Sequence, residues 1–266
     1  MATIVTREEY LASRAEGRRV SFHALKDFAH NGKEFHLRQI GELPQPPESR
    51  EMFIGTAAHT LILEGREKYR DAYEVADGPV NPKTGKPYGN DTKVFRDWFA
   101  MQTKPVITTD EAALIEAMRD AVAAHGVASQ LLADGIAETP IFFDWFGTPC
   151  QSQVDWISKS WGIIDLKTTA DLDRFVWTAR DARYINQLAF YRRAVGELFG
   201  ESMDCFIVAV EKARNPRCGV FAIPKPDLDE AEDWCIQQIA ALAEAEATGV
   251  WRDGYEGLRQ LTLRNI

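Results

Sequence analysis

The sequence has no long uninterrupted apolar run. A membrane-spanning helix needs roughly eighteen or more consecutive apolar residues, and none of the 266 positions begins such a stretch. The opening segment, MATIVTREEYLASR, carries acidic residues where a secretory signal has a cationic start and an apolar middle. These absences predict a soluble chain with no membrane association, which is not secreted and works in the cytoplasm.

Cysteine is scarce and dispersed. There are four cysteines, far apart in the sequence and without a CxxC pair, at Cys150, Cys205, Cys218 and Cys235. This spacing excludes the usual zinc clamp and the dense disulfide framework of small secreted domains. It fits a reducing compartment.

Positive charge is also in short supply, because 31 Lys and Arg face 40 Asp and Glu, a net charge of −9. Such a balance argues against a surface that binds nucleic acid everywhere. The acids crowd the segments 71–77 and 227–247, whereas arginines gather at 174–193. A local basic track inside an acidic body is therefore compatible with the composition.

The N-terminal half predicts helices. Ser21 is a suitable N-cap for a helix over 22–30 that ends at the Asn31-Gly32 pair. A proline-rich linker at 43–49 precedes a second helix over 51–65, which carries His59. Residues 77–92 predict a mobile loop, and two more helices are expected near 92–101 and 109–125.

From Thr139 the pattern changes to strands. Three runs rich in β-branched and aromatic residues, at 139–146, 150–158 and 161–169, are too close for anything but antiparallel hairpins. A helix over 181–200, a strand over 203–210, a strand over 219–224 and a long helix follow. The crossover helix makes the strands on either side of it parallel.

The expected fold class is therefore α/β, a central mixed sheet flanked by helices with a helical N-terminal part. We expect a single domain over 1–266, divided into the helical part at about 1–135, a sheet core at about 136–225 and a C-terminal helix at about 226–250.

Three residues on neighbouring strands carry chemistry. Asp165 and Lys167 alternate on one strand and so share a face, while Leu166 points to the opposite side. Asp155, on the preceding strand, reaches the same face if the two strands pair. Two close carboxylates repel unless a cation separates them, and Mg²⁺ takes oxygen ligands. The two aspartates and the lysine together predict hydrolysis of a phosphodiester by a metal-activated water, with Lys167 beside the metal.

Asp155 followed by Asp165-Leu166-Lys167 resembles the D…(D/E)-x-K core of the PD-(D/E)XK nucleases, which implies a restriction-endonuclease-like core. Further features match the RecB and RecE branches of this superfamily, and the segment VSFHALKDFAHNGKEF at 20–35 resembles the start of RecE-type domains. They are the helical His59, the acidic Glu138 directly before the first strand of the meander, and the Q-x-x-x-Y pair on the next helix, Gln187 and Tyr191.

The resemblance implies a distribution of roles. Asp155, Asp165 and the Leu166 carbonyl would hold one Mg²⁺, which Mn²⁺ could replace, with His59 supporting it. Glu138 would assist a second ion. Lys167 would orient the attacking water, and Gln187 and Tyr191 would complete the catalytic set. DNA contacts are expected from a group of cationic and aromatic side chains, Tyr184, Arg180, Arg183, Arg192 and Arg193.

The resemblance also implies an activity and partners. RecE-type enzymes are 5′-to-3′ exodeoxyribonucleases that degrade linear double-stranded DNA and leave 3′ overhangs. The implied assembly is a ring, a homotetramer, that works with a RecT-like annealing protein in recombination of phage DNA, in the cytoplasm of the bacterial host. A ring would need its arginines only around the central channel.

Other hypotheses remain open. The chain could be a RecB-like or Cas4-like nuclease, although the cysteines are not clustered as an iron–sulfur site would require, or an endonuclease of the same superfamily. It could be a non-catalytic DNA-binding module that has the nuclease fold. A hydrolase of another phosphate ester is a further alternative.

Overall fold

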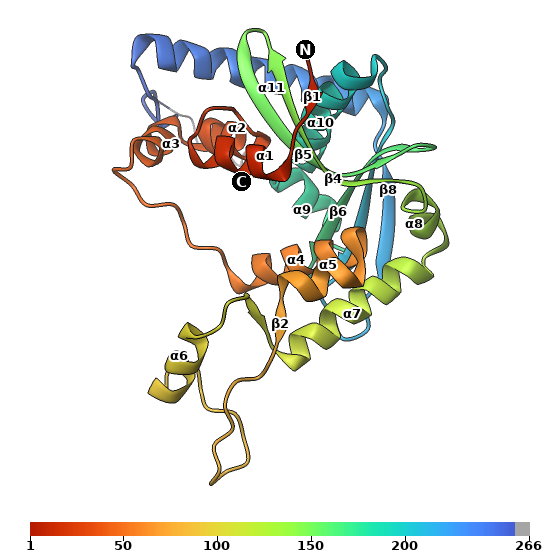
Figure 1. The fold of residues 1–266 in the computed structure, drawn as a ribbon. Helices are drawn as coiled ribbons and strands as arrows, with labels where there is room; N and C mark the ends of the chain where they lie inside the picture. Colours follow the sequence, from red (N-terminus) through yellow and green to blue (C-terminus); the bar gives the residue numbers. More distant parts are fainter. Residues whose placement is uncertain (259–266) are drawn as a thin grey trace.

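The computed structural model describes residues 1–258 and has a six-stranded mixed sheet at its centre (Figure 1). The strand order is β1-β4-β5-β6-β7-β8, and a separate two-stranded pair is formed by β2 and β3. The strands are β1 Thr3–Ile4, β2 Glu74–Val75, β3 Val106–Ile107, β4 Gly135–Trp145, β5 Thr148–Ser158, β6 Gly162–Thr169, β7 Cys205–Glu211 and β8 Cys218–Ala222.

Helices occupy most of the N-terminal half and flank the sheet. They are α1 Arg7–Ala15, α2 Phe22–His30, α3 Gly32–Gln39, α4 Arg50–His59, the π-helix η1 Thr60–Glu64, α5 Gly65–Ala72, α6 Lys93–Ala100, α7 Thr109–Ala124, α8 Gly126–Leu131, α9 Phe175–Asp181, α10 Tyr184–Phe199 and α11 Lys225–Thr248. The expected mixed α/β fold with flanking helices is confirmed. Within residues 1–258, no helix combines the length and the apolar character needed to span a bilayer.

The predicted strand connections are also confirmed. β4, β5 and β6 form an antiparallel meander, whereas β6 and β7 pair in parallel across the crossover helix α10. In the parallel pair, Asp165 lies opposite Ile207 and Lys167 lies opposite Ala209. β6 is therefore an interior strand, and its position is fixed by neighbours on both sides.

Each face of the sheet packs against its own helices. On one face, Ile163 and Ile207 join buried side chains of α2, α10 and α11. On the other, Ile164 and Leu166 join buried side chains of α4, η1, α7 and α8. Burial of apolar side chains on both faces stabilises the central strands. Asp165, at 0% exposure, thus lies inside the protein.

Several elements differ from the sequence-based expectation. α1 was not predicted, although Thr6 and Glu9 form a reciprocal capping box, a recognisable start signal. Asn31 ends α2 as expected, but its side chain also caps α3, so a helix begins where a turn was expected. α10 begins at Tyr184 because Arg183 is left-handed, with φ 59°. The predicted domain end at residue 266 lies outside the described residues.

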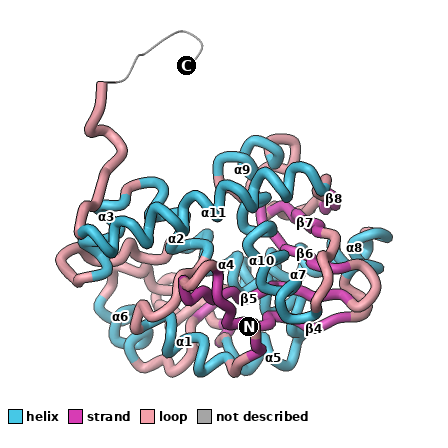
Figure 2. Tube along the Cα trace, turned by 90° about the horizontal axis from the view of Figure 1, so that it is seen from above, coloured by secondary structure: helices cyan, strands magenta, loops and turns pink. Residues whose placement is uncertain are grey.

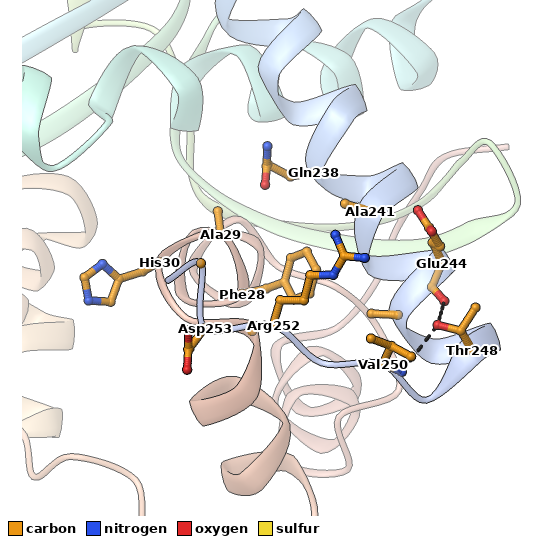
Figure 3. Close-up of a pocket in the computed structure, with 13 residues that line it drawn as sticks. Phe28, Ala29, His30, Gln238, Ala241, Glu244, Thr248, Val250, Arg252 and Asp253 are labelled. Atoms are coloured by element: carbon orange, nitrogen blue, oxygen red, sulfur yellow. Dashed lines mark hydrogen bonds between the residues drawn. The ribbon is translucent and has the colours of Figure 1, made fainter. Parts of the chain in front are cut away.

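The C-terminal segment is held against α3. The Trp251 ring stacks on His36 with centroids 4.2 Å apart, and the Lys33 amide donates to the Arg252 carbonyl. The segment leaves the body beside α3 when it is viewed from above (Figure 2). A hollow between α2 and the end of α11 is lined by Arg252 and Thr248 among others (Figure 3). None of the predicted site residues lines this hollow.

Gly162 fixes the start of β6 and provides a test of the fold. It has φ 108°, and a Cβ there would lie 2.4 Å from the Asp204 carbonyl oxygen. We expect Gly162→Ala to lower the free energy of unfolding by about 3 kcal/mol, from backbone strain plus steric overlap. The measurement is urea denaturation.

Gly147 is the matched control for this substitution. It also has positive φ, 82°, but a Cβ there would meet no atom of residues 1–258 within 4 Å. Gly147→Ala should therefore cost only about 1 kcal/mol. Equal losses for the two variants would contradict the role of the contact with Asp204.

Candidate active site

The site begins where β5 and β6 separate. Their backbone ladder pairs Ser158 with Gly162 and ends at Trp156 and Ile164. One step further, Asp155 places its carboxylate where a backbone partner would otherwise be, and its Oδ2 accepts from the Leu166 amide at 2.9 Å. The carboxylate satisfies an amide that the diverging strand leaves unpaired. Asp155 is therefore locked between the two strands.

Asp165 and Lys167 share a face of β6, as strand alternation predicts. Lys167 Nζ lies 2.7 Å from Asp165 Oδ2. Asp165 is 0% exposed, and its Oδ1 has no hydrogen-bond donor within the described part of the chain. A buried carboxylate oxygen without a partner is costly. Such an oxygen is typical of a position that holds a ligand or a metal.

The helix after β6 positions the lysine. Lys167 Nζ donates to Gln187 Oε1 at 3.1 Å, and Gln187 Nε2 donates to the Tyr191 hydroxyl at 2.6 Å. The same ammonium lies 4.7 Å from the centroid of the Tyr184 ring. All three α10 residues predicted for the site thus converge on Lys167. Gln187 and Tyr191 are almost fully buried, so Gln187 contacts the lysine directly and Tyr191 supports it through Gln187.

His59 reaches the site from the opposite side. It is the last residue of α4, directly before the π-helix η1, and its Nδ1 lies 3.5 Å from Asp155 Oδ2. π-helical turns widen a helix and often occur at functional sites. Gly55 permits the close approach of α4, because a Cβ there would lie 3.1 Å from Thr168 Oγ1. The sequence predicted the helix but gave no sign of the π-helical turn.

Glu138 does not precede the first strand of the meander, as expected, but lies inside β4. Its φ of 47° is left-handed, a conformation that is strained for a non-glycine residue. The β4–β5 register pairs Ala137 with Trp156 and Thr139 with Val154, which leaves Glu138 opposite Asp155. The distortion interrupts strand β4 beside Asp155.

Gln153 is a site residue that the sequence analysis missed. Its Nε2 donates to Glu138 Oε2 and holds that carboxylate in place. Gln153 lies two residues before Asp155 on β5, so the alternation of side chains along a strand could have identified it.

Three of these residues form a cluster that can hold a divalent metal. His59, Glu138 and Asp155 each offer a ligand atom, and the three atoms lie within 4.8 Å of one another. Asp165 is not in this group and pairs with Lys167 instead. An imidazole and carboxylates are suitable donors for a divalent ion. Asp165 Oδ1, which has no hydrogen-bond donor among residues 1–258, would also be stabilised by a cation bound nearby.

The pKa values reflect burial and crowding. Burial, followed by the charge of Asp155, raises the pKa of Glu138 to about 7. Burial raises the pKa of Asp165 to about 7 although Lys167 opposes the shift. Burial and the Lys167 charge lower the pKa of His59 to about 4, so its imidazole is neutral and free to bind a metal.

Lys167 shows the opposite balance. Burial alone would lower its pKa, but the carboxylates of Asp165 and Asp155 outweigh burial and raise it. Lys167 therefore stays cationic. A charged ammonium can orient a water or neutralise an oxyanion.

The arginines predicted to contact DNA lie in varied surroundings. Arg192 is 6% exposed and binds Asp229 and Glu232 of α11, so its guanidinium is occupied within the protein and unavailable to a phosphate. The others also have partners but are less enclosed: Arg193 pairs with Glu197, Arg183 lies over the Trp234 ring, and Arg180 pairs with Asp181 at the surface. Arg192 is therefore removed from the predicted DNA contacts. For Arg180, Arg183 and Arg193, DNA contact stays a prediction.

A comparison with protein-family models matches residues 21–257 to the PDDEXK-like domain of unknown function DUF3799. The chain belongs to this family. Among solved structures, the fold is similar to the crystal structure of a "Putative exonuclease" from Eubacterium rectale, with a TM-score of 0.67 and 15% identity. The likeness covers 98% of this chain and 96% of the other. No curated protein matches.

Family membership and geometry agree on the superfamily. The PD-(D/E)XK core predicted from Asp155, Asp165 and Lys167 is confirmed as a fold, and these three side chains lie together in it. Nucleases of this superfamily generally use divalent metals, and the cluster around Asp155 offers the ligands for one. The family match and the site geometry support a nuclease of this superfamily. Assignment to the RecE subtype is a proposal.

The crowded carboxylates give a prediction for stability. Because the pKa of Glu138 in the folded chain, about 7, exceeds its ordinary value of 4.5, the folded state binds more protons between these values. The Glu138 contribution to stability therefore falls as pH rises through this range. In EDTA, we expect Glu138→Gln to raise Tm relative to the unmodified chain by about 2–4 °C at pH 8, and by less at pH 5.

Saturating Mn²⁺ should reverse the order of the two Tm values. The metal stabilises the protein that binds it more tightly, which we expect to be the unmodified chain with Glu138. Differential scanning calorimetry at both pH values, with and without the ion, measures this. A Glu138→Gln chain that is less stable than the unmodified chain at pH 8 in EDTA would show that Glu138 is a structural residue.

Proposed function

We propose that this protein is a Mg²⁺-dependent exodeoxyribonuclease that degrades linear double-stranded DNA from the 5′ end and leaves 3′ single-stranded overhangs. The observation that carries the proposal is the convergence of Asp155, Asp165 and Lys167 on one buried spot, beside His59 and Glu138. The RecE-like opening at 20–35 and the order of the site residues along the chain support the exonuclease.

The residues divide the work in phosphodiester hydrolysis. His59, Glu138 and Asp155 would hold the ion, and the buried Asp165 adds negative charge beside them. When bound, the ion activates water and neutralises charge on the phosphate. The cationic Lys167 orients the attacking water and stabilises the developing oxyanion. Gln187 restrains the ammonium in that direction through its hydrogen bond.

We also propose the assembly that the RecE likeness implies: a ring of four subunits, in the bacterial cytoplasm, that passes its 3′ overhang to a RecT-like annealing protein. The acidic composition supports a ring, because each subunit needs cationic side chains only where it faces the DNA. Light scattering of the purified chain measures the subunit number.

Substrate topology tests the exonuclease. In Mg²⁺, linear duplex should be degraded progressively while a closed circular plasmid stays intact, because an exonuclease requires an end. Duplexes labelled at one end, with and without a 5′ phosphate, should lose the 5′ label first. Nicking or linearisation of the circle would favour an endonuclease, and cleavage of neither substrate would overturn the nuclease assignment.

Two variants on facing elements test the division of work. Lys167→Ala should lower kcat at least about 100-fold, because a group that acts in the transition state is lost. Gln187→Ala should lower kcat about tenfold, since it only restrains the lysine. Steady-state kinetics on linear duplex measures both, and circular dichroism checks that each variant folds. Full activity of Lys167→Ala would remove Lys167 from the mechanism.

A further inference from the structure

Residues 78–104, here called the arm, project from the body. The arm consists of the segment between β2 and α6, helix α6 and the turn that leads to β3. In Figure 1 it extends below α4 and α7, away from the sheet. Neither the family likeness nor the predicted site assigns it a role.

The base of the arm is firmly held. Glu74 and Val75 of β2 pair in parallel with Val106 and Ile107 of β3. Just before the arm, the Asp77 carboxylate accepts from the amide and the hydroxyl of Thr109, both at 2.7 Å. These contacts fix where the arm leaves the body.

Within the arm, aromatic rings pack on its own backbone. The rings of Phe95 and Trp98 lie 5.3 Å apart, and a Cβ at Gly78 would come within 2.9 Å of the Phe95 ring. The arm thus holds its shape without support from the sheet.

The charge of the arm is opposite to that of the rest of the chain. The arm has five Lys and Arg and two Asp, a net charge of 5 − 2 = +3, and the remainder of the 266 residues carries −9 − 3 = −12. Lys83 and Lys86 are exposed, and neither ammonium has a partner among residues 1–258. A concentration of free cations on a projection of an acidic protein favours a polyanion as partner.

The apolar surface of the arm is too small for a stable contact with a second copy. Val80, Val94, Phe99 and Met101 are 58%, 45%, 51% and 71% exposed. They offer roughly 400 Å², whereas a stable interface buries about 800 Å² on each partner. Exposed aromatic and thioether groups beside lysines suit a DNA surface, which has sugar and base edges as well as phosphates.

The base of the arm lies near the active site. The Arg50 guanidinium, at the start of α4, donates to the Val106 carbonyl at the base of the arm, 2.9 Å away. His59 ends the same helix, so the base and the site are about 14 Å apart along α4 at 1.5 Å per residue. That length is about four base-pair steps of duplex.

We infer that the arm binds the phosphate backbone of the DNA substrate outside the active site, through Lys83 and Lys86. This inference rests on the proposed function, and it adds a second contact that holds the duplex while the end is processed. The expected effect is on binding, because neither lysine belongs to the catalytic cluster.

Salt dependence of binding is the test. Anisotropy of a labelled duplex, with Ca²⁺ in place of Mg²⁺ to prevent cleavage, gives the slope of log K against log salt. Lys83→Ala/Lys86→Ala should make this slope less steep by about 1.8, which corresponds to two lost phosphate contacts. In Mg²⁺ the same variant should raise KM and leave kcat unchanged.

The matched control removes equal charge elsewhere. Lys68→Ala/Lys159→Ala changes two exposed lysines of α5 and the β5–β6 turn, and should leave the slope and KM as they are. A second pair, Phe99→Ser/Met101→Ser, tests for a protein partner by light scattering. If that pair changed the subunit number and the lysine pair left the slope unaltered, the arm would be a contact between copies and the inference would fail.

The outcomes separate this inference from the nuclease proposal. Cleavage of DNA with an unaltered slope in Lys83→Ala/Lys86→Ala overturns the arm alone. An arm-dependent slope without cleavage in Mg²⁺ supports the arm and overturns the nuclease. Absence of both binding and cleavage overturns both.

Discussion

The structure depends on placing two carboxylates and one ammonium in its interior. Asp165 has no exposure and Asp155 is 9% exposed, and their carboxylates lie against the Lys167 ammonium and the Leu166 amide. Burial favours the neutral acid, and a second carboxylate nearby increases that preference. Such an arrangement destabilises a fold unless the surrounding elements are stable in their own right. β6 meets this need because it is an interior strand with apolar side chains packed on both faces.

The separation of β5 and β6 makes the buried carboxylates accessible to other residues of the site. A regular ladder would have continued through Asp155 and Asp165 and would have left no room between the strands. Instead, the Asp155 side chain takes the Leu166 amide, and the opening admits His59 from one side and Glu138 from the next strand. The elements that form the site are thus the same ones that interrupt the sheet. The left-handed Glu138 and the π-helical turn after His59 are the two local distortions that accompany the opening.

Much of this could be read from the sequence, because strand alternation and hairpin spacing are local properties. These properties were enough to predict that Asp155, Asp165 and Lys167 lie together. They were also enough to predict that β6 and β7 are parallel. Glu138 was misplaced because no pattern of residues announces a left-handed residue within a strand. Arg192 was assigned to DNA because its acidic partners on α11 are 37 and 40 residues away in the sequence. Tertiary pairing at that distance has no local signature.

The net charge of −9 is compatible with a DNA substrate because charge acts locally. Seven of the 40 acidic side chains lie on α11, which packs with α10 on the face of the sheet opposite α4. Exposed charges are largely screened beyond about 8–10 Å in physiological salt. An approaching phosphate therefore responds to the cations nearest to it, the buried Lys167 and the lysines of the arm. On this argument the distribution of charge, and not its sum, determines where DNA can bind.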